Sequence, residues 1–396
     1  MSTAGRARLS PRASLLLLAS ILVSFLAASA APTPLYGIYQ ERWHFSPVTT
    51  TVVFAVYALA VLASLLTFGK LSDHVGRRPV LAVAIVVQMV SLVVFVFANG
   101  VPTLLAARLV QGLAAGAATG AVGAAMLDID RARGTLANSI APGIGTGSGA
   151  LLSALLIQFL PAPTRLVYVV LLVILLIQAV AVALMPETVT RMPGARRSLR
   201  PDIKLPHSVR QPVLVVVPVL FAVWALAGFF GALGPALVRA LMNTSIVVGG
   251  LVLFVFALFG SIAVLVLRNT AARTVILTGI AALILGMVVT LVSVMAESVP
   301  GFFVGLALGG VGFGGGFQGS LKMIMPLVEA HERASVLSLL YVVCYVGFGL
   351  PTVIAGFLVV YGGGVPRTAD EYSVAVILLA LVALFGVRRA TRMSPG

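Results

Sequence analysis

Charged residues are scarce in this sequence. Only 9% of its 396 residues are Asp, Glu, Lys or Arg, whereas 60% are hydrophobic. Soluble domains carry roughly a quarter charged residues, so the composition excludes a water-soluble globular protein. Acids are scarcer than bases: 11 Asp and Glu stand against 26 Lys and Arg, for a net charge of +15. This positive excess has to be explained by where the basic residues lie.

Residues that bind metals and nucleotides are also scarce. Cys344 is the single cysteine, which excludes an internal disulfide and a cysteine-based metal cluster. The four histidines are widely separated, at positions 44, 74, 207 and 331. The sequence has no Gly-x-x-x-x-Gly-Lys-Ser/Thr loop, so ATP is not the direct energy source. We therefore expect no metal site, no cofactor and no enzymatic activity.

Long apolar runs fill almost the whole chain. A bilayer core about 30 Å thick needs roughly 20 apolar residues per helix. On that basis the spans are predicted at 14–38, 48–69, 79–98, 102–126, 136–160, 164–185, 212–236, 246–267, 273–295, 299–325, 334–360 and 370–387. The sequence thus predicts an all-α membrane protein with 12 transmembrane helices.

The longest polar interval divides these helices six and six. We expect an N-terminal half over 1–185, a basic linker over 186–211 and a C-terminal half over 212–396. The charged start and the apolar run after it resemble a signal peptide, but its removal would leave an odd number of spans. We expect the first helix to be retained.

The basic residues favour one orientation. Lys and Arg concentrate in cytoplasmic loops of membrane proteins. With the N-terminus inside, the cytoplasmic segments hold Arg6, Arg8, Arg12, Lys70, Arg77, Arg78, Arg131, Arg133, Arg191, Arg196, Arg197, Arg200, Lys204, Arg210, Arg268, Arg273, Arg333, Arg388, Arg389 and Arg392. The opposite side holds only Arg42, Arg165, Arg239 and Arg367. We therefore expect a multi-pass protein of the cell membrane with both termini in the cytoplasm, in contact with lipids and not with nucleic acid.

The two halves resemble each other. Pro102 and Pro300 each open the fourth helix of their half, and both helices are rich in glycine. Each helix then leads through a charged link to a fifth helix that contains Gly and Pro. Many secondary transporters have such internal repeats and bind their substrate near the bilayer midplane.

The loop between the second and third spans carries a recognisable motif. It reads Gly-Lys-Leu-Ser-Asp-His-Val-Gly-Arg-Arg over residues 69–78. It resembles the Gly-x-Leu-x-Asp-x-x-Gly-Arg-Arg loop of the major facilitator superfamily (MFS), and the matching positions are Gly69, Leu71, Asp73, Gly76, Arg77 and Arg78. The resemblance implies the 12-helix MFS fold and a loop that latches the two halves on the cytoplasmic side.

A second segment of the fourth span is similar to the Arg-x-x-Gln-Gly sequence of that family. Its residues are Arg108, Gln111 and Gly112, which share one helical stripe. A charged residue costs at least ~2.5 kcal/mol at the centre of a membrane helix, so Arg108 should face protein or a watery cavity. The alternative is that Arg108 extends toward the outer headgroups.

The fifth span contains Pro142, Gly143 and Gly147. They resemble the Gly-Pro-x-x-Gly-Gly segment of MFS antiporters, although Ala141 and Thr146 replace two of its glycines. The resemblance implies export of a substrate.

We therefore expect a secondary transporter that alternates between inward-facing and outward-facing states and moves a small molecule. The first choice is efflux of an amphipathic drug or metabolite through a cavity lined by aromatic residues: Tyr36, Tyr57, Trp224, Tyr341 and Tyr345, together with Phe25 and Phe230. The alternative is uptake of a small anionic metabolite, because Arg108 and Lys322 are the charges within the spans. A non-transporting receptor or scaffold would need a soluble domain, for which the chain has no room.

Proton coupling is what the resemblance implies. However, none of the 11 acids lies in the middle of a predicted span: Glu41 and Glu297 are at the outer ends, and Asp73, Asp128 and Glu187 are at the inner ends. Coupling through Asp73 or Asp128, through another group, or no coupling at all therefore remain open. We expect the protein to act as a monomer.

Overall fold

The computed structural model describes residues 9–201, 203–242, 245–329 and 331–392. Within these residues every regular element is a helix, and 12 helices are long and apolar enough to cross a membrane. This confirms the predicted all-α, 12-helix architecture. The elements are α1 (Pro11–Ala30), α2 (Tyr36–Trp43), α3 (Pro47–Phe68), α4 (Leu71–Val75), α5 (Arg77–Val96), α6 (Val101–Ile129), α7 (Arg131–Phe159), α8 (Leu166–Leu184), α9 (Ala195–Ser198), η1 (His207–Val209), α10 (Arg210–Met242), α11 (Ile246–Val266), α12 (Ala272–Met295), α13 (Val299–Ile324), η2 (Met325–Leu327), α14 (Arg333–Tyr361) and α15 (Gly364–Arg392).

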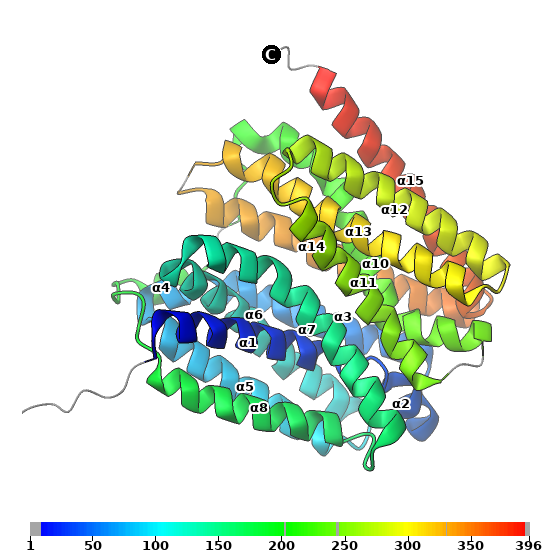
Figure 1. The fold of residues 1–396 in the computed structure, drawn as a ribbon, viewed down its shortest axis with the longest axis horizontal. Helices are drawn as coiled ribbons and strands as arrows, with labels where there is room; N and C mark the ends of the chain where they lie inside the picture. The colour runs from blue at the N-terminus through cyan, green and yellow to red at the C-terminus, as the bar shows by residue number, and fades with distance from the viewer. Residues whose placement is uncertain (1–8, 202, 243–244, 330, 393–396) are drawn as a thin grey trace, which may run out of the picture.

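The helices form two groups, and the chain passes from one to the other through the segment that contains α9 and η1 (Figure 1). We call α1–α8 the N-half and α10–α15 the C-half. The halves meet along two pairs of helices, α3 with α14 and α7 with α11. We call the end of the bundle that holds residues 69–79 the loop end, and the end that holds α2 the far end.

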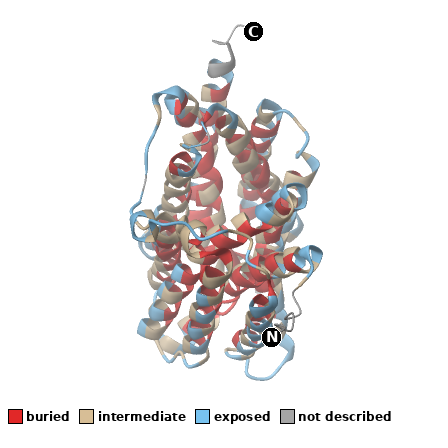
Figure 2. Ribbon diagram, turned by 90° about the vertical axis from the view of Figure 1, so that its left-hand side faces the viewer, coloured by how far each residue is buried: buried red, intermediate tan, exposed pale blue. Residues whose placement is uncertain are grey.

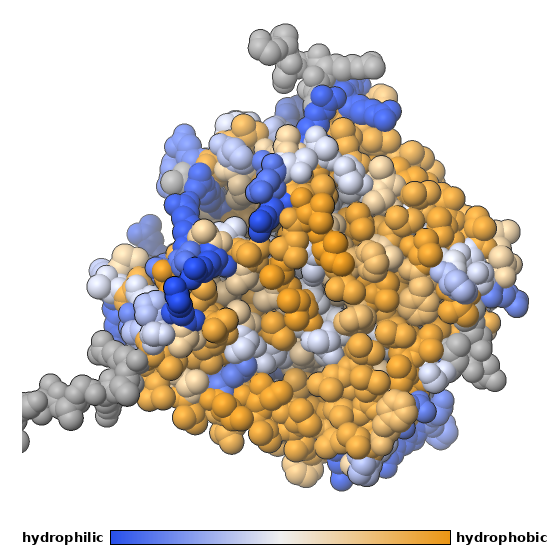
Figure 3. Space-filling model, viewed as in Figure 1, coloured by the Kyte–Doolittle hydropathy of each residue, from blue (hydrophilic) through white to orange (hydrophobic). Residues whose placement is uncertain are grey.

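The surface of the bundle is arranged as expected for a protein surrounded by lipid. Buried residues gather where helices face one another, and exposed residues lie on the outside of the bundle and in the loops (Figure 2). On the face seen in Figure 3, hydrophobic residues cover the middle, and the hydrophilic ones gather mainly toward the ends. Because the hydrocarbon core cannot hydrogen-bond to polar groups, this distribution suits a membrane-spanning bundle.

The first predicted span is broken, which corrects the expectation of one helix over 14–38. Helix α1 ends at Ala30, and α2 begins at Tyr36 after a tight turn. The turn contains Pro32 and Pro34, which have no backbone N–H to continue the helical hydrogen-bond pattern. The carbonyl groups near this break must then find other donors.

Helices α12 and α13 form an unusually close pair. A Cβ atom on Gly286 would lie 2.6 Å from the backbone nitrogen of Gly309, and one on Gly312 would lie 2.8 Å from the Cα of Leu283. Similarly, a Cβ on Gly315 would lie 3.0 Å from the Cα of Gly279. The two backbones therefore touch directly, as small residues allow in membrane helices.

Candidate functional site

The motif loop forms a tight corner between α3 and α5. Gly69 follows α3, and a Cβ on Gly120 of α6 would lie only 3.1 Å from the Gly69 carbonyl oxygen. Leu71 begins α4 and packs, partly buried, against the core. Gly76 separates α4 from α5 with φ 107°, a conformation that glycine adopts without strain. Gly69 thus allows α6 to approach the end of α3 closely, and Gly76 allows the chain to turn between α4 and α5.

Arg77 is the centre of the loop's polar contacts. Its side chain is nearly buried, and its guanidinium donates to three side chains: Ser72 Oγ at 2.7 Å, Asp128 Oδ2 at 3.1 Å and Asp73 Oδ1. One cation thereby joins the loop to the end of α6. Such charge-assisted bonds are roughly twice as strong as neutral ones. All of these partners lie in the N-half.

Glu187 completes this network from the end of α8. Its Oε1 accepts from the backbone N–H of Arg77 at 2.8 Å, and its Oε2 accepts from that of Arg78 at 3.1 Å. These are first-turn N–H groups of α5, where a carboxylate also interacts favourably with the helix dipole. Thr188 adds a bond to Asp128 at 3.1 Å. In contrast, the Arg78 guanidinium donates to the Ala183 carbonyl and to no other group in the described part of the chain.

The expected latch between the halves is not formed by these contacts, which stay within the N-half. The sequence also did not reveal that Asp128 and Glu187 complete the Arg77 network. They lie 51 and 110 residues from Arg77, and their pairing depends on how α6 and α8 pack around α5. The one available signal was that both acids stand at the predicted inner ends of their spans.

Arg108 is fully buried, with 0% of its surface exposed, so it does not extend to the headgroups. Its guanidinium donates to the Ser29 carbonyl at 2.8 Å, to Gln111 Oε1 at 2.7 Å and to the Tyr36 hydroxyl. Gln111 Nε2 in turn donates to the Ala28 carbonyl at 3.0 Å. Arg108 and Gln111 therefore satisfy carbonyl groups at the broken end of α1, where a cation also opposes the negative end of the helix dipole.

Aromatic rings enclose the Arg108 guanidinium. Its carbon lies 5.1 Å from the ring centroid of Tyr57, 5.7 Å from that of Tyr36 and 5.9 Å from that of Phe54. These distances are within the range of cation–π attraction. Among the described residues, no carboxylate forms an ion pair with Arg108. Its charge is thus held by hydroxyl, amide and carbonyl oxygens and by ring faces.

Two other expected cavity residues have different positions. A Cβ on Gly112 would lie 2.5 Å from the Cβ of Ala60, so Gly112 allows α6 to pack closely against α3. Lys322 lies near the loop end, where its amine donates to the carbonyls of Leu267, Arg268 and Thr270 at 2.7–3.1 Å. Lys322 therefore closes the end of α11 instead of presenting a charge to the middle of the bundle, which corrects our expectation.

An aromatic cluster lies in the C-half between α10, α13 and α14. Trp224 of α10 is surrounded by Phe313 and Phe317 of α13 and by Tyr345 and Phe348 of α14, with ring centroids 5.1–5.9 Å away. Tyr341 joins the cluster beside Tyr345, at 6.5 Å. We call these six residues the Trp224 cluster. They are only partly buried, and the Trp224 Nε1–H has no acceptor among the described residues.

The Trp224 cluster is connected to the Arg108 site. Phe348 stacks on Phe54 of α3, with ring centroids 4.9 Å apart, and Phe54 also faces the Arg108 guanidinium. The structure thus brings together Tyr36, Tyr57 and Arg108 in one half, with Trp224, Tyr341 and Tyr345 in the other. Phe25 and Phe230 are instead buried in the core. This differs from their expected place on a cavity wall.

The glycines of the fifth span lie on α7, which continues through Pro142. Gly143 faces α11 of the C-half, where an added Cβ would overlap Ser261 Oγ and lie 3.0 Å from the Ala257 carbonyl. Gly147 also faces α11, with the Cα of Phe254 at 3.3 Å from such a Cβ. This motif therefore lies at the contact between the halves.

Substitution of Gly143 is expected to weaken that contact. Gly143→Ala should force α7 and α11 apart at a cost of about 1–3 kcal/mol, the usual range for overpacking. Combining it with Ser261→Ala removes the overlapping hydroxyl and should restore most of the loss. The measurement is the Tm of the purified variants together with their transport rate; an unchanged Gly143→Ala protein would contradict the close contact.

Twelve helices long and apolar enough to span a membrane, arranged in two groups, define a multi-pass membrane protein. Residues 16–273 match the sequence profile of the Major Facilitator Superfamily, and the chain belongs to this superfamily. Its members are membrane transporters and not enzymes. This confirms the resemblance inferred from the loop at residues 69–78.

Known relatives match only parts of the chain. An uncharacterized transporter of Rickettsia bellii (strain RML369-C) is 39% identical over 74 residues, which is 18% of each protein. The uncharacterized MFS-type transporter YybF of Bacillus subtilis (strain 168) is 26% identical over 132 residues, 32% of each protein. The matches thus span a third or less of these relatives.

Solved structures match over nearly the full length but at low identity. The inward-facing, unoccupied structure of a bacterial homolog of the human lysosomal transporter Spinster superposes with a TM-score of 0.75 at 14% identity, covering 98% of this chain and 99% of that chain. A point mutant of the nucleoside transporter NupG gives 0.70 at 12% identity, covering 96% of this chain and 100% of that chain. At such identities the similarity shows the fold alone.

Proposed function

We propose that this transporter exports a small amphipathic compound from the cytoplasm by alternating access, and that the Trp224 cluster forms the main wall of its substrate site. The observation that carries this proposal is the position of the cluster. Six partly buried aromatic residues lie together in the C-half, and one of them, Phe348, stacks on Phe54 of the N-half. The Trp224 Nε1–H is a buried donor without an acceptor among the described residues. A ligand with an apolar ring system and one hydrogen-bond acceptor would match these groups.

The contacts between the halves support an inward-facing arrangement. Thr51 and Gly356 meet toward the far end, while Phe54 and Phe348 meet nearer the middle. The residues of the cluster farthest from these contacts, Phe317 and Tyr341, lie nearer the loop end of their helices. A ligand that reaches the cluster would thus enter from the loop end. The direction of net transport is proposed from the antiporter-like segment at Pro142.

The same geometry argues against uptake of an anionic metabolite. That alternative depended on Arg108 and Lys322 as anion-binding charges. Each donor nitrogen of the Arg108 guanidinium already bonds to a protein oxygen, and the Lys322 amine bonds to three carbonyls. An anion would have to displace these bonds.

The orientation proposed here places the loop end in the cytoplasm, as the distribution of basic residues favours. In a Cys344→Ser protein, a single cysteine is placed either at partly exposed Ser198 or at exposed Asn99. Labelling of these cysteines reports the orientation, because the two positions are predicted on opposite sides of the membrane. We expect an impermeant thiol reagent added to intact cells to label position 99 and not position 198. Labelling of position 198 under these conditions would contradict the orientation.

Protons are the proposed coupling ion. Asp73 and Asp128 are the carboxylates placed to respond to movement of the loop at residues 69–78, because both accept from Arg77. Substrate transport by proteoliposomes should then move protons in the opposite direction, measured with an internal pH-sensitive dye. Asp128→Asn should reduce this proton movement. Substrate transport without any proton movement would exclude coupling.

Substrate binding can be tested with the protein's own fluorescence. The chain has 2 tryptophans, Trp43 and Trp224, so Trp43→Phe leaves the cluster residue as the single indole. Phenylalanine keeps an aromatic ring beside Tyr39, on which Trp43 stacks at 4.6 Å. A panel of amphipathic aromatic compounds is then titrated, and we expect at least one to quench or shift the emission saturably.

Transport of the same compound by inverted membrane vesicles tests the function itself. Trp224→Phe should keep the apolar wall but lose the donor, so affinity should fall by about tenfold, the effect of roughly 1.4 kcal/mol for one hydrogen bond. Phe385→Leu, an exposed substitution on α15, is the matched control and should bind normally. Equal affinity of the parent and of Trp224→Ala would overturn the proposed site.

A further inference from the structure

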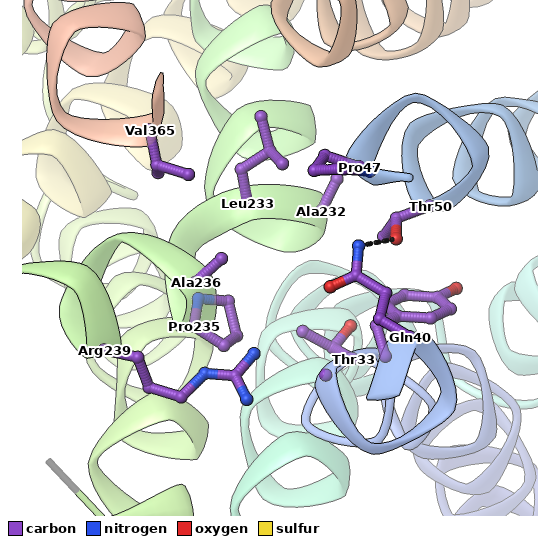
Figure 4. Close-up of a pocket in the computed structure, with 12 residues that line it drawn as sticks. Thr33, Gln40, Pro47, Thr50, Ala232, Leu233, Pro235, Ala236, Arg239 and Val365 are labelled. Carbon is purple, nitrogen blue, oxygen red and sulfur yellow. Dashed lines mark hydrogen bonds between the residues drawn. The ribbon is translucent and has the colours of Figure 1, made fainter. Parts of the chain in front are cut away.

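A small cavity lies between the halves at the far end, separate from the Trp224 cluster. Its volume is about 30 Å³. The N-half contributes the turn after α1, α2 and the start of α3, and the C-half contributes α10 and the start of α15 (Figure 4). Because a water needs about 10–15 Å³ by this measure, the cavity accommodates a monatomic ion with one or two waters but no organic substrate.

Arg239 brings a positive charge to this cavity across the contact between the halves. Its guanidinium lies against the backbone of Gly37 on α2, where an added Cβ would overlap it. Figure 4 shows the guanidinium pointing from α10 toward Thr33. Among the described residues, none forms an ion pair or hydrogen bond with the Arg239 guanidinium.

Two other polar groups of the cavity, the hydroxyls of Thr33 and Thr50, can act as donors as well, whereas Gln40 brings one amide oxygen to the lining. Thr33 is 2% exposed, and its hydroxyl has no partner in the described part of the chain. The Thr50 hydroxyl accepts from Gln40 Nε2 at 2.9 Å, which leaves its own proton free to donate. A guanidinium and two hydroxyl donors therefore surround one small space.

No acid balances this charge within the described lining. None of the described residues that line the cavity is Asp or Glu. Glu371, on the α15 helix that borders the cavity, is paired with Arg367 at 3.1 Å. The Tyr36 ring borders the cavity, and its hydroxyl accepts from Arg108, a second cation without a carboxylate partner among the described residues. Arg239 is partly buried, and a cation that is withdrawn from water is stabilised by an opposite charge, which a dissolved anion can supply.

We propose that this cavity binds one small inorganic anion with the size and charge of chloride, held by Arg239, Thr33 and Thr50. Since both halves contribute to the site, it exists only while the far end is closed. A ligand that binds one of two states shifts the population toward that state. Chloride would thereby stabilise the closed far end without entering the substrate path. The proposal requires only that the halves separate at this end during transport.

The test measures closure of the far end directly. Spin labels are attached at exposed Ser46 and Ala296, one in each half, in full-length Cys344→Ser protein in lipid nanodiscs. Chloride is exchanged for gluconate at constant ionic strength, because gluconate has the same charge but exceeds the cavity. We expect chloride to raise the closed-to-open ratio saturably, by about tenfold, a typical magnitude for ligand coupling.

Two variants connect this effect to the cavity. Arg239→Gln removes the charge, and Thr33→Val removes one donor with little change in shape; both should lose most of the chloride dependence. Arg165→Gln, which removes another far-end arginine that is exposed and does not line the cavity, should keep it. Equal distance distributions in chloride and gluconate for the parent, or full chloride dependence in both cavity variants, would overturn the proposal. Ligand quenching at Trp224 is measured independently, so the proposed function and this site can fail separately.

Discussion

Replacement of Arg108 by alanine is expected to reduce transport to less than a tenth of the parental rate. The substitution leaves three buried acceptors without their donor: the Ser29 carbonyl, Gln111 Oε1 and the Tyr36 hydroxyl. Each unsatisfied buried group costs about 1–3 kcal/mol. The broken end of α1 should then loosen, and with it the contact through Phe54 to the Trp224 cluster. Transport in proteoliposomes and the Tm of the purified protein measure the two effects.

Arg108→Lys separates charge from geometry. Lysine keeps the positive charge but lacks the planar fork that reaches the Ser29 carbonyl and the Tyr36 hydroxyl together. We expect it to retain part of the transport. Arg42→Ala, at an exposed arginine on α2, is the matched control and should transport normally. If Arg108→Ala folds and transports at the parental rate, its contacts have no functional role.

The second large effect is expected for Arg77→Ala. Without this guanidinium, the negative charges of Asp73 and Asp128 repel each other with no cation between them. The Ser72 hydroxyl also loses the donor to which it is bonded. Breaking a buried ion pair by removing one partner typically costs about 3–5 kcal/mol. The partial exposure of both acids reduces that cost here, so we expect a loss of transport by at least tenfold with measurable folded protein.

Arg78→Ala provides the control for this experiment. Arg78 is the neighbouring arginine of the same motif, but within the described residues its guanidinium donates to the Ala183 carbonyl alone. Its loss should change transport less than threefold. Equal effects of the two alanine variants would mean that positive charge at the headgroups, and not the Arg77 network, is what the loop requires.

The architecture was predictable because it follows from local composition. Apolar runs of about 20 residues must cross the bilayer as helices, and glycine with proline marks their ends. The exception was the first span, where hydropathy alone hid the break between Ala30 and Tyr36. Pro32 and Pro34 were the available signal. Proline is tolerated in many membrane helices, including at Pro142, so the signal was ambiguous.

The candidate sites were predictable only in part because they depend on contacts between distant segments. The loop motif and Arg108 were found from residue type and spacing. Their partners Asp128, Glu187 and Ser29 come from other segments of the chain. The two acids were marked only by their place at the predicted inner ends of their spans, and nothing local indicated the Ser29 carbonyl. For Lys322, charge inside a span suggested a cavity, whereas three nearby carbonyls account for its position. Charge alone does not distinguish a ligand site from a helix end.

The backbone contact between α12 and α13 has a consequence for how this transporter can evolve. Where Gly279, Gly286 and Gly315 allow two helices to touch, almost any larger side chain would separate them. The face on which these two helices touch therefore tolerates few substitutions. Helices α10 and α14 carry four of the six residues of the Trp224 cluster. Both helices also have partly exposed positions that accept a change of side chain. New substrate preferences should consequently arise by substitutions on those two helices, against a contact between α12 and α13 that stays constant.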